Sequence, residues 1–253
     1  FVCFKKEKIM IVIVLGMHRS GTSAIAGILH LNKIIMGSKD NFKPKPLPQN
    51  PKGFYENYDF RKINDKMLND VNYKVKSLNY NIPIPLPRKK IESKMEYLIK
   101  KQIEQYSYWG WKDPRTCLTL DHWLNIILKY KKKDDIKIIF TIRDPLAVAN
   151  SLKKRDGLDI HSGLKLWRVY NQRALNFVNS YKISTFYFFY EQLIINPNNV
   201  NLKMFKFLKI DSKQEIISKF IDSKLNRSEQ RKVYKIPNEF EDLKNKFKDL
   251  SSV

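Results

Sequence analysis

The sequence has few cysteines and no long apolar run. Its two cysteines, Cys3 and Cys117, lie far apart and form neither a CxxC metal pattern nor a disulfide framework, so a reducing compartment is expected. The first apolar run, Ile9–Leu15, is too short to span a bilayer and lacks the cleavage site of a signal peptide. We therefore expect a cytoplasmic protein without a membrane span. Because the chain begins at Phe1 rather than methionine, a preceding targeting segment stays open.

Acidic residues are scarce relative to basic ones. The 253 residues include 48 Lys and Arg against 25 Asp and Glu, a formal net charge of +23. This excess favours an anionic partner, such as a nucleotide, an acidic glycan, nucleic acid or a membrane surface. The alternative is a lysine-rich composition on a solvated surface, as runs such as KYKKKDD indicate. A hydrophobic content of 43% is in the globular range and predicts a folded chain.

Apolar runs alternate with segments of helical spacing. The runs predict strands at 9–15, 136–142 and 184–190, and YWGWK predicts a further short strand before a proline turn. Helices are predicted at 20–31, 61–75, 92–106, 117–130, 146–154 and 162–181, with others beginning near Val200 and Lys213. The alternation predicts an α/β fold with a central parallel sheet flanked by helices, the three-layer architecture of P-loop nucleotide kinases.

One domain is expected over residues 1–253. Its core is predicted at about 9–225, and the last residues, about 228–253, form a charged and weakly patterned tail. Two proline-rich stretches, KPKPLPQNPKGFYEN and NIPIPLPRKK, interrupt the chain. They mark a lid and acceptor region at about 39–106, because such loops next to a ligand site often carry function.

The segment after the first strand has the layout of a phosphate-binding loop. It reads GMHRSGTS and consists of Gly16, Met17, His18, Arg19, Ser20, Gly21, Thr22 and Ser23. Backbone N–H groups at the start of the following helix would bind one phosphate group. Triphosphatase loops need a lysine directly after the second glycine, but Thr22 stands there, and the loop's cation is Arg19. ATP hydrolysis is therefore a poor fit.

Polar clusters follow three of the strands, as GMHRSGTS, KDPR and RDP. The carboxyl ends of parallel strands meet at one edge of the sheet. We therefore expect Arg19, Lys112 (alone or with Arg115) and Arg143 to converge there. Three converging cations favour a polyanionic ligand.

The three motifs, in the order GMHRSGTS, KDPR and IRDPLAVANS, resemble the sulfotransferase superfamily that uses 3′-phosphoadenosine-5′-phosphosulfate (PAPS). The similarity is closest to bacterial sulfotransferase-like families and more distant to tyrosylprotein sulfotransferases. These enzymes carry G-x-x-R-S-G-T, a later K-D-P, and an arginine followed eight residues on by a serine, as Arg143 and Ser151 are here. The resemblance spans about residues 9–196. It implies in-line transfer of a sulfuryl group to a hydroxyl or amine, release of adenosine 3′,5′-bisphosphate, and no required metal ion.

The resemblance also assigns roles to residues. Residues 16–23 would hold the donor's 5′-phosphate, with Arg19 at the bridging oxygen. Lys112 matches a lysine that the tyrosylprotein branch places near the transferred group.

The other donor contacts are implied by the same resemblance. Arg143 and Ser151 would bind the 3′-phosphate. Tyr190, in FYEQL, matches a segment that contacts adenine. Arg227, in LNRSEQRK, is placed in a basic 3′-phosphate loop by region alone.

A general base is needed to take the acceptor's proton. Glu56, in the NPKGFYEN stretch of the lid, is the first choice by region and pattern. Asp40 is the second, and His18 and His122 follow.

Two other functions stay open. One is a P-loop kinase for a small molecule or nucleoside, which the missing loop lysine disfavours. The other is a non-catalytic basic module that binds acidic glycan or nucleic acid. For a sulfotransferase, the net charge favours a glycan or another anionic polymer as acceptor, and no specific nucleic acid is expected. The sequence leaves the oligomeric state open.

Overall fold

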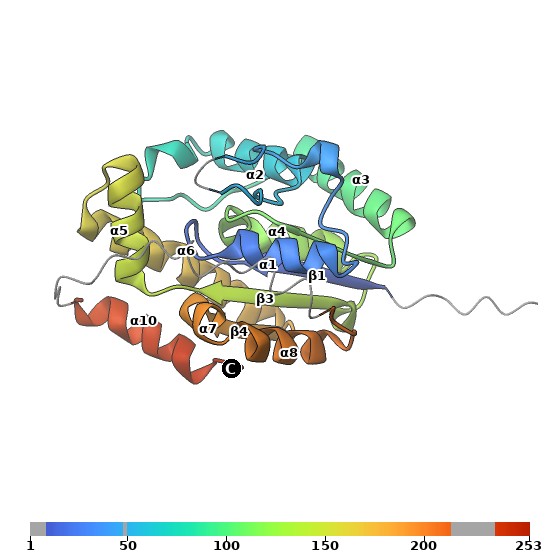
Figure 1. The fold of residues 1–253 in the computed structure, drawn as a ribbon. Helices are drawn as coiled ribbons and strands as arrows, with labels where there is room; N and C mark the ends of the chain where they lie inside the picture. The colour runs from blue at the N-terminus through green and yellow to red at the C-terminus, as the bar shows by residue number, and fades with distance from the viewer. Residues whose placement is uncertain (1–8, 48–49, 214–235) are drawn as a thin grey trace, which may run out of the picture.

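Four parallel strands form the centre of the computed structural model, which describes residues 9–47, 50–213 and 236–253 (Figure 1). The strands are β1 (Met10–Leu15), β2 (Tyr108–Lys112), β3 (Ile136–Ile142) and β4 (Thr185–Phe189). Their order in the sheet is β2-β1-β3-β4, and each neighbouring pair is parallel. The predicted α/β fold with a central parallel sheet is confirmed. All four carboxyl ends therefore lie at one edge of the sheet.

Helices follow each strand. They are α1 (Thr22–Leu31), α2 (Tyr58–Asp70), α3 (Lys89–Gln105), α4 (Thr116–Ile127), α5 (Pro145–Asp156), α6 (Ile160–Tyr181), α7 (Tyr190–Ile195), α8 (Pro197–Leu208) and α10 (Asn238–Asp249). The predicted helix near Lys213 lies outside the described residues. Among the helices of the described residues, none has the length and apolar character needed to cross a bilayer.

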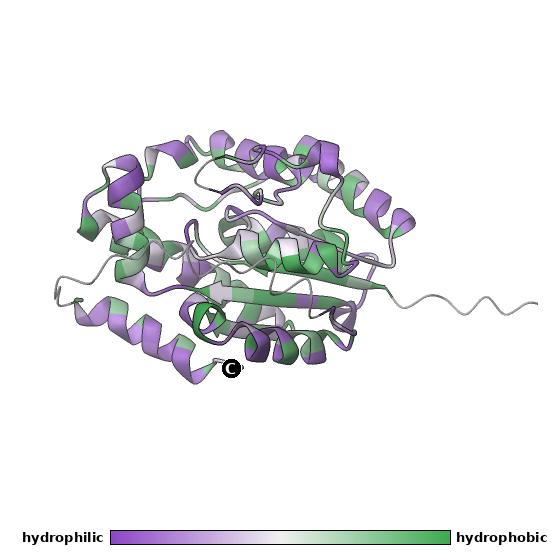
Figure 2. Cartoon of the chain, in the orientation of Figure 1, coloured by the Kyte–Doolittle hydropathy of each residue, from purple (hydrophilic) through white to green (hydrophobic). Residues whose placement is uncertain are grey.

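The side chains of β1 alternate between two apolar clusters. Ile11 and Ile13 pack with side chains of α2, α3, α4, α6 and α10 on one face of the sheet. Val12 and Val14 pack with side chains of α1 and α8 on the other face. A strand covered on both faces needs apolar residues at every position, which explains the unbroken run in the sequence. Figure 2 shows the hydrophobic strands between helices with hydrophilic outer faces.

The last strand is two residues shorter than predicted, by one residue at each end. Tyr190 is the first residue of α7 rather than the end of β4. The backbone N–H of Phe189 donates to the Gln192 side chain at 2.7 Å and so starts the helix there. An aromatic run such as STFYFFY carries no signal for that boundary.

The charged segment at 228–253 contains a packed helix. Phe240, Leu243 and Phe247 of α10 are buried, while Lys and Glu occupy its outer face. These apolar residues recur at i, i+3 and i+7, which places them on one side of a helix. Lys244 Nζ also lies 3.0 Å from the Asp144 carboxylate at the start of α5.

Candidate functional site

The loop after β1 follows a tight path at the carboxyl edge of the sheet. Gly16 has φ +145°, and a Cβ there would lie 2.5 Å from the backbone oxygen of Thr141. Gly21 has φ +79°, and a Cβ there would lie 2.0 Å from the Tyr190 ring. Both positions therefore require glycine, for backbone conformation and for space. Arg19 between them is also left-handed, with φ 72°.

Helix α1 begins without a cap. Its N-cap residue Gly21 makes no side-chain hydrogen bond, and the first turn contains no acidic residue. The first N–H groups of a helix have no partner within the helix, and the helix dipole makes this end positive. In the preceding loop, Ser20 Oγ is fully buried and, among the described residues, has no hydrogen-bond partner. Unpaired donors at a positive helix end suit a phosphate group.

Arg143 and Ser151 brace this loop through Arg19. Arg19 Nε donates to Ser151 Oγ on α5 at 2.8 Å, and Arg143 donates to the Arg19 backbone carbonyl at 2.8 Å. The Arg143 guanidinium lies 5.2 Å from the centroid of the Tyr190 ring. Burial, together with the positive charges of Arg155 and Arg143, lowers the pKa of Arg19. This crowding of positive charge would be relieved by an anion.

Arg155, whose positive charge acts on Arg19, was not among the predicted residues, and its guanidinium lies 2.6 Å from the Asp156 carboxylate. Arg155 stands four residues after Ser151 on α5, and residues at this spacing share one face of a helix, so the sequence could have indicated it.

Lys112 and Glu56 form a buried ion pair beside the loop. Lys112 Nζ lies 2.9 Å from Glu56 Oε1 and donates to Ser23 Oγ at 3.3 Å. Lys112 is 1% exposed and Glu56 is 7% exposed. Arg61 on α2 lies 3.5 Å from the second carboxylate oxygen of Glu56. The lid therefore delivers a carboxylate to the lysine and the phosphate loop at one point.

Comparison with known proteins identifies this arrangement of elements. No protein-family model matches the sequence, and no curated protein matches it. A solved structure, the sulfotransferase domain from the curacin biosynthetic pathway, superposes with a TM-score of 0.57 over 95% of this chain and 98% of that chain, at 15% identity. The sulfotransferase domain from the Synechococcus PCC 7002 olefin synthase gives 0.50 over 98% of this chain and 90% of that chain, at 18% identity. The chain has the sulfotransferase fold.

Within the sulfotransferase fold, the candidate bases occupy different places. Glu56 contacts Lys112, as described above. Asp40 is exposed in a short 3-10 turn, and His122 Nε2 lies 2.8 Å from a backbone carbonyl oxygen between α2 and α3. Burial lowers the pKa of His18 to about 3, which makes it a weak proton acceptor. The geometry therefore favours Glu56.

Arg115 is already paired with two carboxylates. Its guanidinium pairs with Asp113 at 2.8 Å and with Asp65 on α2. Asp113 is fully buried and also accepts from the Asn64 side chain at 2.8 Å. Burial alone would raise the pKa of Asp113, but Arg115 and Asn64 outweigh it and hold the pKa below its usual range. Of the two alternatives that the sequence leaves open, these ion pairs favour Lys112 alone, and the pair of Arg115 and Asp113 fixes the KDPR turn.

The other residues predicted to contact the donor differ in how far their side chains are buried. Met17 is fully buried in the core, so only its backbone faces the loop. Thr22 is 5% exposed at the first position of α1. Tyr190 is half-buried and covers Gly21. Arg227 lies outside the described residues.

Proposed function

We propose that this chain transfers the sulfuryl group of PAPS to a hydroxyl or amine acceptor. The observation that carries the proposal is the position of Lys112, whose Nζ contacts Ser23 of the phosphate loop and Glu56 of the lid. The sulfotransferase fold supports the same reading. On this proposal residues 1–253 form one sulfotransferase domain, with 39–106 as its lid and acceptor region.

The loop and its two braces would hold the donor, which supplies the sulfuryl group and departs as adenosine 3′,5′-bisphosphate. The N–H groups at the start of α1, with the hydroxyls of Ser20 and Ser23, suit the 5′-phosphate. Arg143 and Ser151 suit the 3′-phosphate, since they meet at Arg19 on the same side of the loop. Tyr190 lies beside Arg143, where it could stack on the adenine.

The residues around Lys112 account for the chemistry. A new bond forms between the acceptor's oxygen or nitrogen and sulfur, and the bond from sulfur to the bridging phosphate oxygen breaks. Glu56 takes the acceptor's proton. Arg19 and Lys112 stabilise the negative charge that develops on the bridging oxygen. Such a loose, in-line transfer depends mainly on positioning and charge stabilisation, which fixed cations provide.

A glycan is the proposed acceptor class. It offers free hydroxyl groups, and acidic members of the class would be attracted by a net charge of +23.

Transfer of labelled sulfate from PAPS to pooled glycans, lipids and tyrosine peptides tests the proposal. We expect labelling of glycans, with Arg19→Ala and Lys112→Ala each reducing turnover by roughly 100-fold or more. Lys206→Ala, an exposed lysine on α8, is the matched control and should leave turnover unchanged. Unchanged turnover in either site variant would refute the assigned roles.

A further inference from the structure

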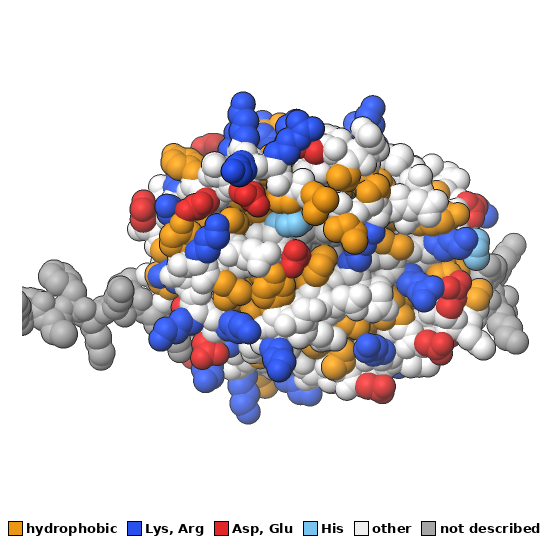
Figure 3. Space-filling view, turned by 180° about the vertical axis from the view of Figure 1, so that it is seen from behind, with side chains coloured by type: hydrophobic (Ala, Val, Ile, Leu, Met, Phe, Trp, Pro, Cys, Tyr) orange, Lys and Arg blue, Asp and Glu red, His pale blue; other side chains and the backbone are white. Residues whose placement is uncertain are grey.

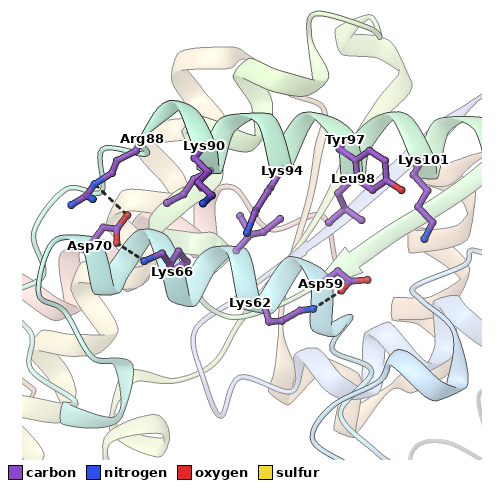
Figure 4. A pocket seen from close by; sticks show the side chains of 12 residues that line it. Asp59, Lys62, Lys66, Asp70, Arg88, Lys90, Lys94, Tyr97, Leu98 and Lys101 are labelled. Atoms are coloured by element: carbon purple, nitrogen blue, oxygen red, sulfur yellow. Dashed lines mark hydrogen bonds and ion pairs between the residues drawn. The ribbon is translucent and has the colours of Figure 1, made fainter.

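A groove of about 740 Å³ lies between α2 and α3 (Figure 4). On the face of the molecule in Figure 3, Lys and Arg side chains are interspersed with Asp and Glu, as expected of a solvated basic surface. The groove is different because its charge is concentrated. Six basic side chains and two aspartates line it, the basic ones being Lys62, Lys66, Arg88, Lys90, Lys94 and Lys101.

The α2 wall of the groove is largely neutralised. Lys62 lies 3.0 Å from Asp59, and Lys66 lies 3.1 Å from Asp70. Arg88, which precedes α3, also approaches Asp70 at 3.8 Å. Each aspartate of the groove is thus engaged on this side.

The α3 wall keeps its charge. Lys90, Lys94 and Lys101 are exposed, and no carboxylate among the described residues pairs with them. They recur at i, i+4 and i+11 on one face, a stripe about 16 Å long at 1.5 Å per residue. Tyr97, which is 70% exposed, stands between them in the same groove. A row of unpaired like charges creates a field suited to an extended anion.

A series of contacts runs from the groove to the backbone of the lid segment that carries Glu56. The Tyr58 ring at the start of α2 lies 4.9 Å from Lys62 Nζ in the groove and 4.4 Å from Lys43 Nζ in the lid. The backbone N–H of Lys43 donates to the Glu56 carbonyl at 3.0 Å. A polymer leaving the groove at this end would therefore lie next to the lid segment that carries Glu56.

We propose that this groove binds the anionic stretch of a polymeric acceptor, an acidic glycan with carboxylate or sulfate groups. The inference rests on the proposed function and adds the surface that recognises the acceptor. The Tyr97 ring can cover the apolar face of one sugar, while the lysine stripe contacts anionic groups on either side. Single strands of nucleic acid stack successive bases on several aromatic rings, whereas Tyr97 is the one ring among the described residues that line this groove.

Two charge-reversal variants test this proposal. Lys90→Glu/Lys94→Glu/Lys101→Glu removes the stripe. The matched control, with the same change in net charge, alters three exposed lysines on α8 and α10 and is Lys203→Glu/Lys206→Glu/Lys246→Glu. Anisotropy measures the binding of labelled heparin, of neutral dextran and of a single-stranded oligonucleotide over a range of salt concentrations.

We expect the stripe variant to lose at least 10-fold in heparin affinity, and its plot of log affinity against log salt to flatten by roughly two to three units. The control should change by less than 3-fold. In both variants the affinity for adenosine 3′,5′-bisphosphate and the unfolding temperature should match the wild type. With an acidic glycan acceptor, the stripe variant should raise KM and leave kcat unchanged.

Equal losses in the two variants would overturn the proposal, because they would show an effect of net charge alone. Tight binding of the oligonucleotide with weak binding of heparin would also overturn it and assign the groove to nucleic acid. Failure of the wild type to bind adenosine 3′,5′-bisphosphate would instead count against the proposed function, so the two failures are distinguishable.

Discussion

The buried pair of Lys112 and Glu56 gives the most specific prediction for stability. The perturbation is a double-mutant cycle of Glu56→Gln, Lys112→Met and the combined variant. Glu56→Gln removes the negative charge beside Lys112, which is 1% exposed, and leaves its ammonium only neutral acceptors, the new amide oxygen and Ser23 Oγ at 3.3 Å. Lys112→Met leaves Glu56 with Arg61 at 3.5 Å. The two single variants should therefore differ in cost.

The magnitudes follow from the partners that are left. Glu56→Gln strands a buried cation and should lower the free energy of unfolding by about 3–5 kcal/mol. Lys112→Met should cost less, about 1–3 kcal/mol, because Arg61 still compensates the carboxylate. The double variant strands no charge, so it should be more stable than Glu56→Gln alone.

Urea unfolding at pH 7 gives the free energy of unfolding of each variant from the midpoint concentration, provided that the dependence of this free energy on urea concentration is the same in all variants. The exposed pair Lys62–Asp59, at 3.0 Å, serves as control and should couple by no more than about 0.5 kcal/mol. If the double variant is less stable than Glu56→Gln by the full cost of Lys112→Met, the two side chains are energetically independent. That result would refute the placement of the lid carboxylate on Lys112.

Two further predictions concern the loop. Burial lowers the pKa of His18 from 6.5 to about 3, so between these pH values the unfolded chain binds a proton at this residue and the folded chain does not. The free energy of unfolding should therefore fall by up to about 1.4 kcal/mol for each pH unit below 6.5. In urea unfolding between pH 6 and 4, His18→Gln should make the midpoint less dependent on pH, whereas the exposed control His161→Gln should not. Gly21→Ala should lower the unfolding temperature, measured by calorimetry, more than the control Gly157→Ala does. Both glycines have positive φ, but a Cβ at Gly21 would lie 2.0 Å from the Tyr190 ring, whereas one at Gly157 would meet nothing within 4 Å. Equal decreases in the two variants would show that the Tyr190 ring moves away freely.

The sheet and most of its helices, though not α10, could be predicted because their signals are local. The runs at 9–15 and 136–142 are buried on both faces and so stay apolar throughout. Asp144 before Pro145 marks the start of α5, and its side chain accepts from the Ala147 N–H as a cap should. The phosphate loop was visible for the same reason, since eight consecutive residues carry it.

The rest of the site depends on contacts between distant segments. Glu56 reaches Lys112 across 56 positions, and Asn64 reaches Asp113 across 49, so neither pairing leaves a local pattern. Arg115 has the same charge as Lys112 and stands three residues away, and only the positions of Asp113 and Asp65 show that it is already paired.

The groove illustrates the same limit at the scale of helices. The spacing of Lys90, Lys94 and Lys101 predicts a basic stripe on one helix face. It does not show that α2 lies opposite or that its own lysines are neutralised by Asp59 and Asp70.

The most direct test of the central claim is a thermal-shift titration with adenosine 3′,5′-bisphosphate in the presence of EDTA. The loop from Gly16 to Ser23, braced by Arg143 and Ser151, should bind this product without Mg²⁺. At 100 times the dissociation constant, binding should stabilise the chain by about 2.7 kcal/mol. Stabilisation by ATP only with Mg²⁺, and none by adenosine 3′,5′-bisphosphate, would contradict a sulfate donor and favour a kinase.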